Sequence, residues 1–283
     1  MIHVKNVCFQ YRSKEMLFYQ MNTVLERGNI YGLLGGNGEG KSTLLKMIGG
    51  FITPQKGEVL VNDWHPSERT PEFLSNVYYL PEDIWLPDLT LKRYVELYSV
   101  FYPNFNHSKF ESYIKQFGLE GELGRNSKAF SYGQKKKFMI SFALATECEV
   151  LLMDEPTNGL DVTSKTTFRQ LITMEISEDR LMVISTHQVR DLMHLMDPII
   201  ILKDGEVCCN HSLEELEKMF HFKHYRTKEL MEQTPLFMMQ GLGGIQCIEP
   251  ALETSVSEPI DLEFFYSAIN SDQKEELIKL MRS

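Results

Sequence analysis

A glycine-rich loop is the feature that most constrains the fold of this chain. Residues 35–42 read Gly-Gly-Asn-Gly-Glu-Gly-Lys-Ser, which fits the pattern Gly-x-x-x-x-Gly-Lys-Ser/Thr. The apolar residues 30–34 predict a strand before the loop, and residues 43–48 predict the first turns of a helix after it. A strand, a glycine loop and a helix in this order are the setting of a phosphate-binding loop. The complete match disfavours an ordinary glycine turn with an incidental lysine.

The physical chemistry of such a loop assigns its residues to a nucleotide. Glycines let successive backbone N–H groups point at an anion, and the helix N-terminus adds a partial positive charge behind them. Lys41 is expected to reach the β- and γ-phosphates, and Ser42 to offer its hydroxyl to Mg²⁺. The residues expected to contact the nucleotide here are Gly35, Gly36, Asn37, Gly38, Glu39, Gly40, Lys41, Ser42 and Thr43.

A second apolar run ends in two acids. Residues 150–153 form a continuous apolar stretch, typical of a buried parallel strand, and Asp154 and Glu155 follow it. In phosphate-loop enzymes the first acid holds Mg²⁺, directly or through water, and the second polarises the attacking water. Acids at a strand end also cap helices, but the phosphate loop in the same chain favours the catalytic interpretation.

Composition narrows the class of protein. The 283 residues allow one large domain with a small one, or two modest domains. A net charge of −10 disfavours broad electrostatic binding to nucleic acid, although a local basic patch remains open. No apolar run reaches the roughly 18–20 residues of a membrane helix, and the N-terminus lacks a signal-peptide core. The five cysteines show no Cys-x-x-Cys spacing, so free thiols in a reducing cytoplasm are expected.

The apolar periodicity predicts alternating strands and helices, which indicates a parallel α/β core. Strands are expected over 3–9, 21–25, 30–34, 58–61, 76–80, 150–153 and 181–185, and a hairpin over 198–209. Helices are expected over 43–48, 90–117, 131–145, 164–175, 188–196, 213–220 and 272–281.

Further motifs resemble those of one family. Residues 130–134, Phe-Ser-Tyr-Gly-Gln, resemble the signature motif of ATP-binding cassette ATPases, and they precede Asp154 at that family's spacing. Residues 158–161, Asn-Gly-Leu-Asp, resemble its D-loop, and residues 185–187, Ser-Thr-His, resemble its switch histidine. Tyr11 stands where the family stacks an aromatic ring on adenine. With the phosphate loop and the acid pair, the order of motifs is that of the family from residue 1 to about 210.

The resemblance implies a fold and its division. The expected class is α/β: a phosphate-loop NTPase core of mostly parallel sheet with flanking helices, preceded by an antiparallel β region. A helical subdomain is expected as an insertion over about residues 83–146. The nucleotide-binding domain would span 1–212, and a small α+β accessory extension would span 213–283.

The family forms a head-to-tail dimer with two ATP molecules between the subunits. By resemblance, Ser131 and the N–H of Gly133 in one subunit contact the γ-phosphate bound by the other, and Gln134 belongs to the same set. The signature helix would then point its positive end at that phosphate. Asp161 would couple the two sites across the interface.

The remaining assignments also follow the family. His187 is expected to hydrogen-bond the γ-phosphate and to act with Glu155 and Lys41 as the catalytic set. Tyr11 would stack on the base, an interaction worth roughly 1–3 kcal/mol. A histidine after a strand, or a tyrosine in an N-terminal strand, is usually structural, and the position of these two in the motif order is what favours function.

Two departures from the family bear on turnover. Tyr132 replaces the first signature glycine, and its side chain could narrow the approach to the γ-phosphate and slow hydrolysis. Glu82 replaces the usual Q-loop glutamine, and an acid there can still ligate Mg²⁺, so the expected metal ligands are Ser42, Asp154 and Glu82. Glu82 could also be only an acid at a helix start. Residues 79–82, Tyr-Leu-Pro-Glu, resemble an exporter subgroup.

The sequence therefore predicts the ATP-binding and ATP-hydrolysing subunit of an ATP-binding cassette transporter, with ATP and Mg²⁺ as cofactors. Its expected partners are a separate integral membrane permease and a second ATPase chain, identical or paralogous, with no nucleic acid. The expected location is cytoplasmic, peripheral on the inner face of the cell membrane. The alternatives are a soluble cassette ATPase acting on ribosomes or nucleic acid, and a nucleotide sensor that does not hydrolyse.

The predicted helical subdomain is unusually rich in aromatic residues, which exceed the needs of a small core. Some of them are expected to form an exposed groove for the membrane partner. These residues are Trp85, Tyr94, Tyr98, Phe101, Tyr102 and Phe105.

Overall fold

A six-stranded sheet carries the phosphate loop. The computed structural model describes residues 1–12, 15–227, 234–241, 243–251 and 258–282. The strand order is β5-β6-β7-β3-β8-β9, in which only β9 runs antiparallel to its neighbour. The strands are β3 (Ile30–Leu34), β5 (Val77–Leu80), β6 (Val150–Asp154), β7 (Leu181–Thr186), β8 (Ile199–Lys203) and β9 (Glu206–His211). Strands β3, β6 and β7 are buried along their whole length, as their continuous apolar runs predict.

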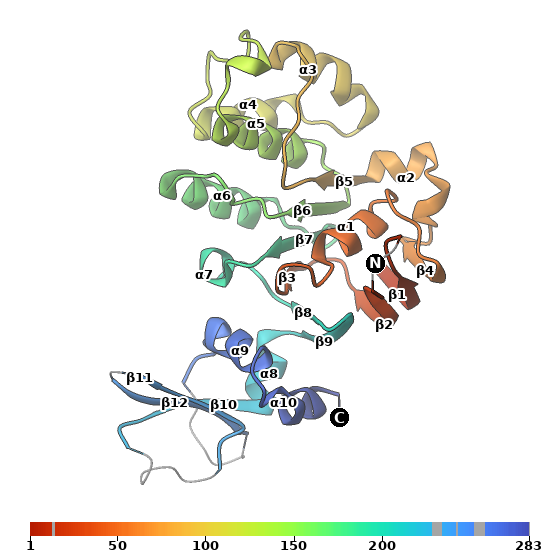
Figure 1. Cartoon of the computed structure of the whole chain (residues 1–283). Coiled ribbons are helices and arrows are strands. Elements are labelled where there is room, and N and C mark those ends of the chain that lie inside the picture. The colour runs from red at the N-terminus through yellow and green to blue at the C-terminus, as the bar shows by residue number, and fades with distance from the viewer. Residues whose placement is uncertain (13–14, 228–233, 242, 252–257, 283) are drawn as a thin grey trace.

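An antiparallel sheet precedes this core. Strands β1 (Ile2–Phe9), β2 (Phe18–Leu25) and β4 (Lys56–Val61) pair in the order β2-β1-β4. Their inward residues share one hydrophobic cluster with helix α1 (Lys41–Ile48) and one face of the central sheet. The predicted α/β class with an N-terminal antiparallel region is confirmed (Figure 1). Phe18, the first residue of β2, packs against Gly40 of the phosphate loop.

A group of helices lies at the top of the molecule in Figure 1. It contains α3 (Leu91–Tyr98), α4 (His107–Gln116) and α5 (Tyr132–Ala145), with short 3₁₀ turns at Ser99–Phe101 and Ser127–Ala129. The prediction of one helix over 90–117 is wrong. The chain leaves the helix at Tyr102, which has extended backbone angles, because Pro103 follows it and cannot continue a helix.

Two other helices also differ from prediction. Helix α7 spans only Val189–Leu192, a single turn, where a helix over 188–196 was expected. Helix α2 (Pro71–Asn76) was not predicted, although Thr70 caps it and proline occupies its first position. Helix α6 (Val162–Glu175) begins where Asp161 caps it. A 3₁₀ turn, Pro66–Glu68, precedes α2.

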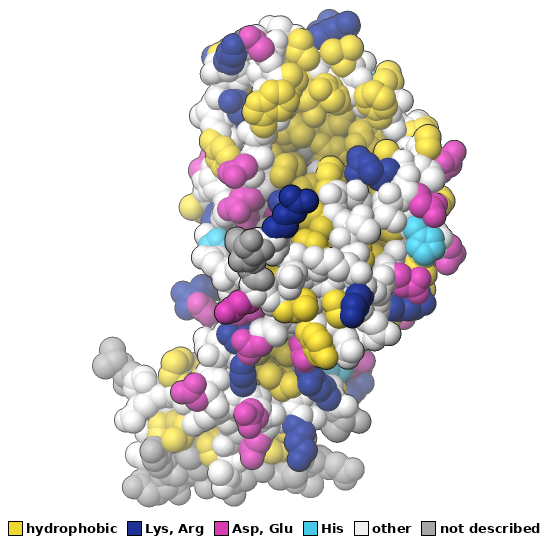
Figure 2. All heavy atoms as spheres, turned by 45° about the vertical axis from the view of Figure 1, so that its right-hand side comes forward, with side chains coloured by type: hydrophobic (Ala, Val, Ile, Leu, Met, Phe, Trp, Pro, Cys, Tyr) yellow, Lys and Arg dark blue, Asp and Glu magenta, His cyan; other side chains and the backbone are white. Residues whose placement is uncertain are grey.

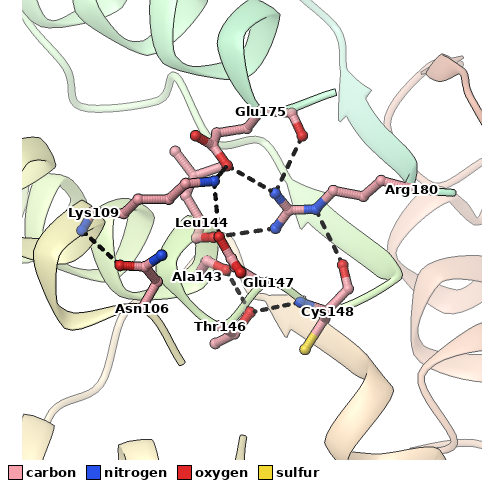
Figure 3. A network of polar contacts seen from close by, with 9 residues as sticks. All are labelled: Asn106, Lys109, Ala143, Leu144, Thr146, Glu147, Cys148, Glu175 and Arg180. Atoms are coloured by element: carbon pink, nitrogen blue, oxygen red, sulfur yellow. Dashed lines mark hydrogen bonds and ion pairs between the residues drawn. The ribbon is translucent and has the colours of Figure 1, made fainter. Parts of the chain in front are cut away.

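A buried arginine fastens the helical group to the sheet (Figure 3). The guanidinium of Arg180 donates to the carbonyl oxygens of Leu144, at 3.2 Å, and Cys148, at 3.1 Å. It also pairs with the buried Glu175 carboxylate, which the ammonium of Lys109 reaches at 2.9 Å. These bonds tie α4 and the C-terminal end of α5 to α6. None of these bonds involves the N-terminal end of α5.

The C-terminal residues form a smaller α+β unit that packs on the main core. It contains α8 (Leu213–Met219), β10 (Phe220–Tyr225), β11 (Phe237–Gly241), β12 (Gly244–Pro250), α9 (Leu262–Ile269) and α10 (Lys274–Met281). The strand order is β10-β12-β11. Phe220, Phe265 and Leu277 belong to the same hydrophobic cluster as strand β8, so the described residues of the unit share the core of the main body. The expected domain limit at residue 212 stays a prediction. Within the described ranges, no helix has the length and apolar character that a membrane crossing requires.

Candidate nucleotide-binding site

A cleft of about 550 Å³ opens above the phosphate loop. That volume lies in the usual range of small-molecule sites. The described residues that line it are Tyr11, Glu15, Leu17, Gly36, Asn37, Gly38, Gly40, Lys41, Ser42, Thr43, Glu82, Asp154, Glu155 and His187. The structure thus brings together most of the residues that the motifs assign to the nucleotide and the metal, from five separate stretches of the chain.

The loop has the backbone geometry of an anion cradle. Gly38 and Gly40 have φ angles of 88° and 101°, in the left-handed region that glycine tolerates. A Cβ atom on Gly40 would stand 2.5 Å from the Phe18 ring, so no larger residue fits there. The buried Lys41 donates to the carbonyl oxygens of Gly35, at 2.7 Å, and Gly36, at 3.3 Å. These contacts hold its ammonium beside the loop, within reach of an incoming phosphate.

Two predicted loop residues do not face the cleft. Neither Gly35 nor Glu39 is among the described residues that line it. The Glu39 carboxylate turns instead to the β8–β9 hairpin, where it accepts from the Asp204 N–H at 2.8 Å and pairs with Lys203 at 3.4 Å. Its side chain therefore braces the loop from outside, and a contact with the nucleotide is left to its main chain.

The two acids at the end of β6 have different surroundings. Asp154 accepts from the hydroxyls of Ser185, at 2.6 Å, and Tyr79, at 3.1 Å. Burial and the neighbouring Asp154 raise the pKa of Tyr79, so its phenol stays protonated and donates. Glu155 is buried, with φ at 45°, and its Oε1 lies 2.8 Å from His187 Nδ1. In the part of the chain that the structure describes, Glu155 Oε2 has no hydrogen-bond partner.

That unpartnered oxygen belongs to a residue that lines the cleft. A buried acceptor without a partner costs about 1–3 kcal/mol, a cost that a bound water or substrate would remove. The proposed metal ligands Ser42, Asp154 and Glu82 line the same cleft and are all oxygen donors. Mg²⁺ is usually held by one or two carboxylates, with phosphate oxygens and water completing its shell, so this set fits it. Among the described residues no cluster of three or more His, Cys, Asp or Glu side chains forms a separate metal site.

Tyr11 stands at the cleft beside the start of α1. Its hydroxyl lies 3.0 Å from Thr43 Oγ1, and its ring meets Phe9 edge to face at 4.9 Å. The side chain is 39% exposed, so part of the ring is open to a ligand. This placement is compatible with stacking on a base, which stays a prediction.

The signature residues form a second group outside this cleft. Ser131, Gly133, Gln134 and Asp161 are not among the described residues that line it. Ser131 and Gln134 close a capping box, with bonds of 3.3 Å and 2.9 Å. Asp161 caps α6 through the N–H and hydroxyl of Ser164 and pairs with Lys137, and these partners lower the pKa of Asp161 to about 2. Both groups of contacts lie at helix N-termini.

Several functional neighbours were missed by the sequence interpretation. Glu15 and Leu17 line the cleft, and Tyr79 and Ser185 hold Asp154. Ser185 had a usable signal, since it lies near the end of an apolar strand, two residues before His187, and the structure pairs it in register with Asp154. The other three depend on which strands are neighbours, which spacing along the chain does not give.

The comparison with known sequences decides the family. A family model described as ABC transporter matches residues 18–158. The ABC transporter ATP-binding protein NatA of Bacillus subtilis is 28% identical over 230 residues, which cover 80% of this chain and 90% of that protein. This chain belongs to the ABC transporter ATP-binding family. As a member of that family it binds ATP and is an ATPase.

Solved structures agree with this membership. An ATP-binding subunit of an ABC transporter matches with a TM-score of 0.70 and 26% identity, over 77% of this chain and 92% of that one. The ATP-binding cassette MJ0796, solved as a dimer with ADP and Pi, matches with a TM-score of 0.66 and 27% identity, over 75% and 99% of the two chains. The human phospholipid-transporting ATPase ABCA3 is 32% identical over 199 residues, but this chain spans only 12% of its length.

Proposed function

We propose that this ABC ATPase is the energy-supplying subunit of an exporter whose permease is a separate membrane protein. The observation that carries the proposal is the combination of a complete phosphate-loop cleft with a large exposed apolar surface on the helical group. On this view the chain lies at the inner face of the membrane and is bound there through its partner. Export is supported by the Tyr-Leu-Pro-Glu sequence at residues 79–82.

The apolar surface supports a membrane-protein partner. Figure 2 shows hydrophobic side chains gathered over the top of the molecule. Trp85, Val100 and Phe101 are 80%, 71% and 64% exposed, and with the partly exposed Leu97 and Tyr98 they define the docking patch. The other predicted groove residues, Tyr94, Tyr102 and Phe105, instead pack around Phe142. Exposed apolar side chains gathered on one face of a molecule are typical of an interaction site.

The cleft residues supply the chemistry of hydrolysis. The loop N–H groups and Lys41 hold the phosphates in place, which fixes the γ-phosphorus in front of Glu155. We assign the Glu155 carboxylate as the base that accepts a proton from the attacking water, and the bond to Oε1 lets His187 keep that carboxylate in orientation. Mg²⁺, held by Ser42, Asp154 and Glu82, would neutralise charge on the phosphate oxygens.

The second group of residues supports action as a dimer. Ser131, Gly133, Gln134 and Asp161 do not face the cleft of their own chain, so we assign them to the nucleotide bound by a second ATPase chain. One chain then offers half of each of two sites. A homodimer and a heterodimer with a paralogue both satisfy this geometry.

The test is Glu155→Gln expressed in the native cell, with ATP present during purification from solubilised membranes. We expect the variant to bind ATP, to lose phosphate release and to retain a stoichiometric multi-span membrane protein. Glu178→Gln, which changes an exposed acid away from the cleft, is the control. Recovery of ribosomal or nucleic-acid-binding partners without a membrane protein would contradict the transporter proposal while leaving the ATPase intact.

The docking patch has its own test. Trp85→Ala is expected to weaken co-purification of the membrane protein without changing ATP affinity. Met174→Ala removes a side chain that is 67% exposed on α6, outside the patch, and serves as the matched control. Equal recovery of the membrane protein with the wild type, Trp85→Ala and Met174→Ala would show that the patch is not the docking surface.

A further inference from the structure

Lys136 is a buried lysine on α5 that the nucleotide site does not explain. Its side chain has no solvent exposure, and it forms no ion pair with any residue in the described ranges. Its ammonium donates instead to the main-chain carbonyl oxygens of Glu82, at 2.7 Å, and Pro81, at 3.4 Å. A buried charge is costly even with such partners. Further along the same helix, the buried residues Phe138–Ala145 are all uncharged, so packing alone does not require a lysine in this position.

Tyr132 binds the same carbonyl from one turn earlier in the helix. Its hydroxyl donates to Glu82 O at 2.6 Å. Its ring lies 5.8 Å from the Lys136 ammonium and packs against Gly159, where a Cβ atom would come within 2.6 Å of the ring. Residues four apart share a helix face, so Tyr132 and Lys136 converge on one acceptor. The side chain that replaces the family's glycine is thus turned toward Glu82 of its own chain.

The Glu82 carboxylate reaches the nucleotide cleft from this fixed backbone. Glu82 lines the cleft, and its Oε1 accepts from the amide of Asn158 at 2.9 Å. The side-chain oxygen of Asn158 lies 3.5 Å from the side-chain nitrogen of Gln188. That nitrogen also lies 3.5 Å from Nε2 of His187. Contacts therefore run from the first turn of α5, through Glu82, toward the histidine that binds Glu155.

We propose that Tyr132 and Lys136 are positioning residues that clamp the main chain of Glu82 to the signature helix and so set the reach of its carboxylate toward Mg²⁺. The inference rests on the proposed function, in which Glu82 is a metal ligand. It assigns a use to the tyrosine at the glycine position: the hydroxyl supplies one of the two bonds, which a glycine cannot. Movement of α5 on dimerisation would then be transmitted directly to the metal ligand.

Equilibrium binding of a fluorescent, non-hydrolysable ATP analogue tests the clamp, with MgCl₂ titrated from zero. Tyr132→Phe and Lys136→Met should each raise the half-saturating Mg²⁺ concentration by about threefold to tenfold, the effect of one lost hydrogen bond. Affinity for the analogue in EDTA should not change. Lys136→Gln keeps a donor for the carbonyl and should lie closer to the wild type. Neither variant should add to the effect of Glu82→Ala, because the clamp acts only through that residue.

The outcomes separate the two proposals. Tyr19→Phe, on the exposed face of β2, is the control for loss of a tyrosine hydroxyl. A wild-type Mg²⁺ curve for Tyr132→Phe, or a full effect retained in the Glu82→Ala background, would overturn the clamp alone. Absence of any analogue binding by the wild type would overturn the proposed function. Should Lys136→Met fail to fold, the 40% exposed Tyr132 still decides the question.

Discussion

The phosphate loop and the signature loop are both short polar segments at a helix N-terminus, yet the structure prepares them differently. Helix α1 begins after Gly40, and no side chain caps it, so its first N–H groups are left for an anion. Helix α5 begins after Ser131, whose side chain and that of Gln134 already satisfy part of the first turn. The first loop is preformed, whereas the second is closed on itself.

This difference suits the proposed nucleotide site, which is divided between two chains. A preformed cradle lets each chain hold its own ATP before it meets a partner. In the single chain, the side chains of Ser131 and Gln134 already satisfy part of the first turn of α5. The signature loop would therefore bind a phosphate only when a dimer brings the partner's nucleotide close to it. Nucleotide affinity should therefore follow the first loop, and turnover should follow both.

The largest expected effect is on the first loop. Lys41→Ala removes the ammonium that is held beside the loop carbonyls of Gly35 and Gly36, and it should lower ATP affinity about a hundredfold, the range for lost bonds to charged groups. Lys46→Ala, later on the same helix and away from the cleft, is the control. Titration of the purified chain with fluorescent ATP measures both. Similar affinities would mean that the loop is not the nucleotide site.

The second prediction concerns strain in the same loop. Gly40→Ala places a Cβ atom 2.5 Å from Phe18 and forces a side chain into the left-handed region, so it should cost about 1–3 kcal/mol of unfolding free energy. Gly133→Ala has no positive φ and meets only the Gly159 carbonyl, at 2.8 Å, so a smaller loss is expected. Urea denaturation of both variants measures the difference. The reverse order would mean that the signature loop is the more tightly built of the two.

The preformed loop and the acid pair could be predicted because their signals are local. The spacing of the glycines, and the apolar run that ends in Asp154, can be read directly from the order of residues in the chain. The turned side chain of Glu39 could not be predicted, since it depends on Lys203 and Asp204, which are far away in the sequence. The break at Pro103 was visible in the sequence, and the strong helical periodicity around it outweighed that signal.

The residues around the second loop show the same limit. Tyr132 could be recognised as a departure, but the direction of its side chain depends on where the Pro81–Glu82 segment passes α5. Lys136 is one of three successive lysines, and nothing in their order along the chain marks which of them is buried. Only the fold distinguishes the buried one.

The third prediction separates the loops by function. Ser131→Arg breaks the capping box and places a charged, bulky side chain at the signature loop. It should leave ATP affinity of the isolated chain unchanged and lower phosphate release at least about tenfold, because a donor to the second nucleotide is lost. In the Glu155→Gln background it should also prevent the ATP-dependent dimer, as measured by light scattering. An unchanged dimer would show that the signature loop does not contact the partner's nucleotide.

The smallest expected effect is electrostatic and lies beside the signature loop. Asp161 has a pKa lowered to about 2 by the N–H and hydroxyl of Ser164 and by Lys137, against an ordinary value of 3.8. Its ionised form therefore stabilises the folded state above pH 3.8, and that contribution disappears as the pH falls through about 2. Because the pair is exposed and asparagine also caps helices, Asp161→Asn should cost less than about 1 kcal/mol. Urea denaturation should give a constant difference from wild type between pH 8 and 5, and a shrinking one at pH 3. If the difference in unfolding free energy instead grows as the pH falls, Asp161 is not held by these donors. The proposal that Asp161 is already fixed in place for the dimer interface would then fail.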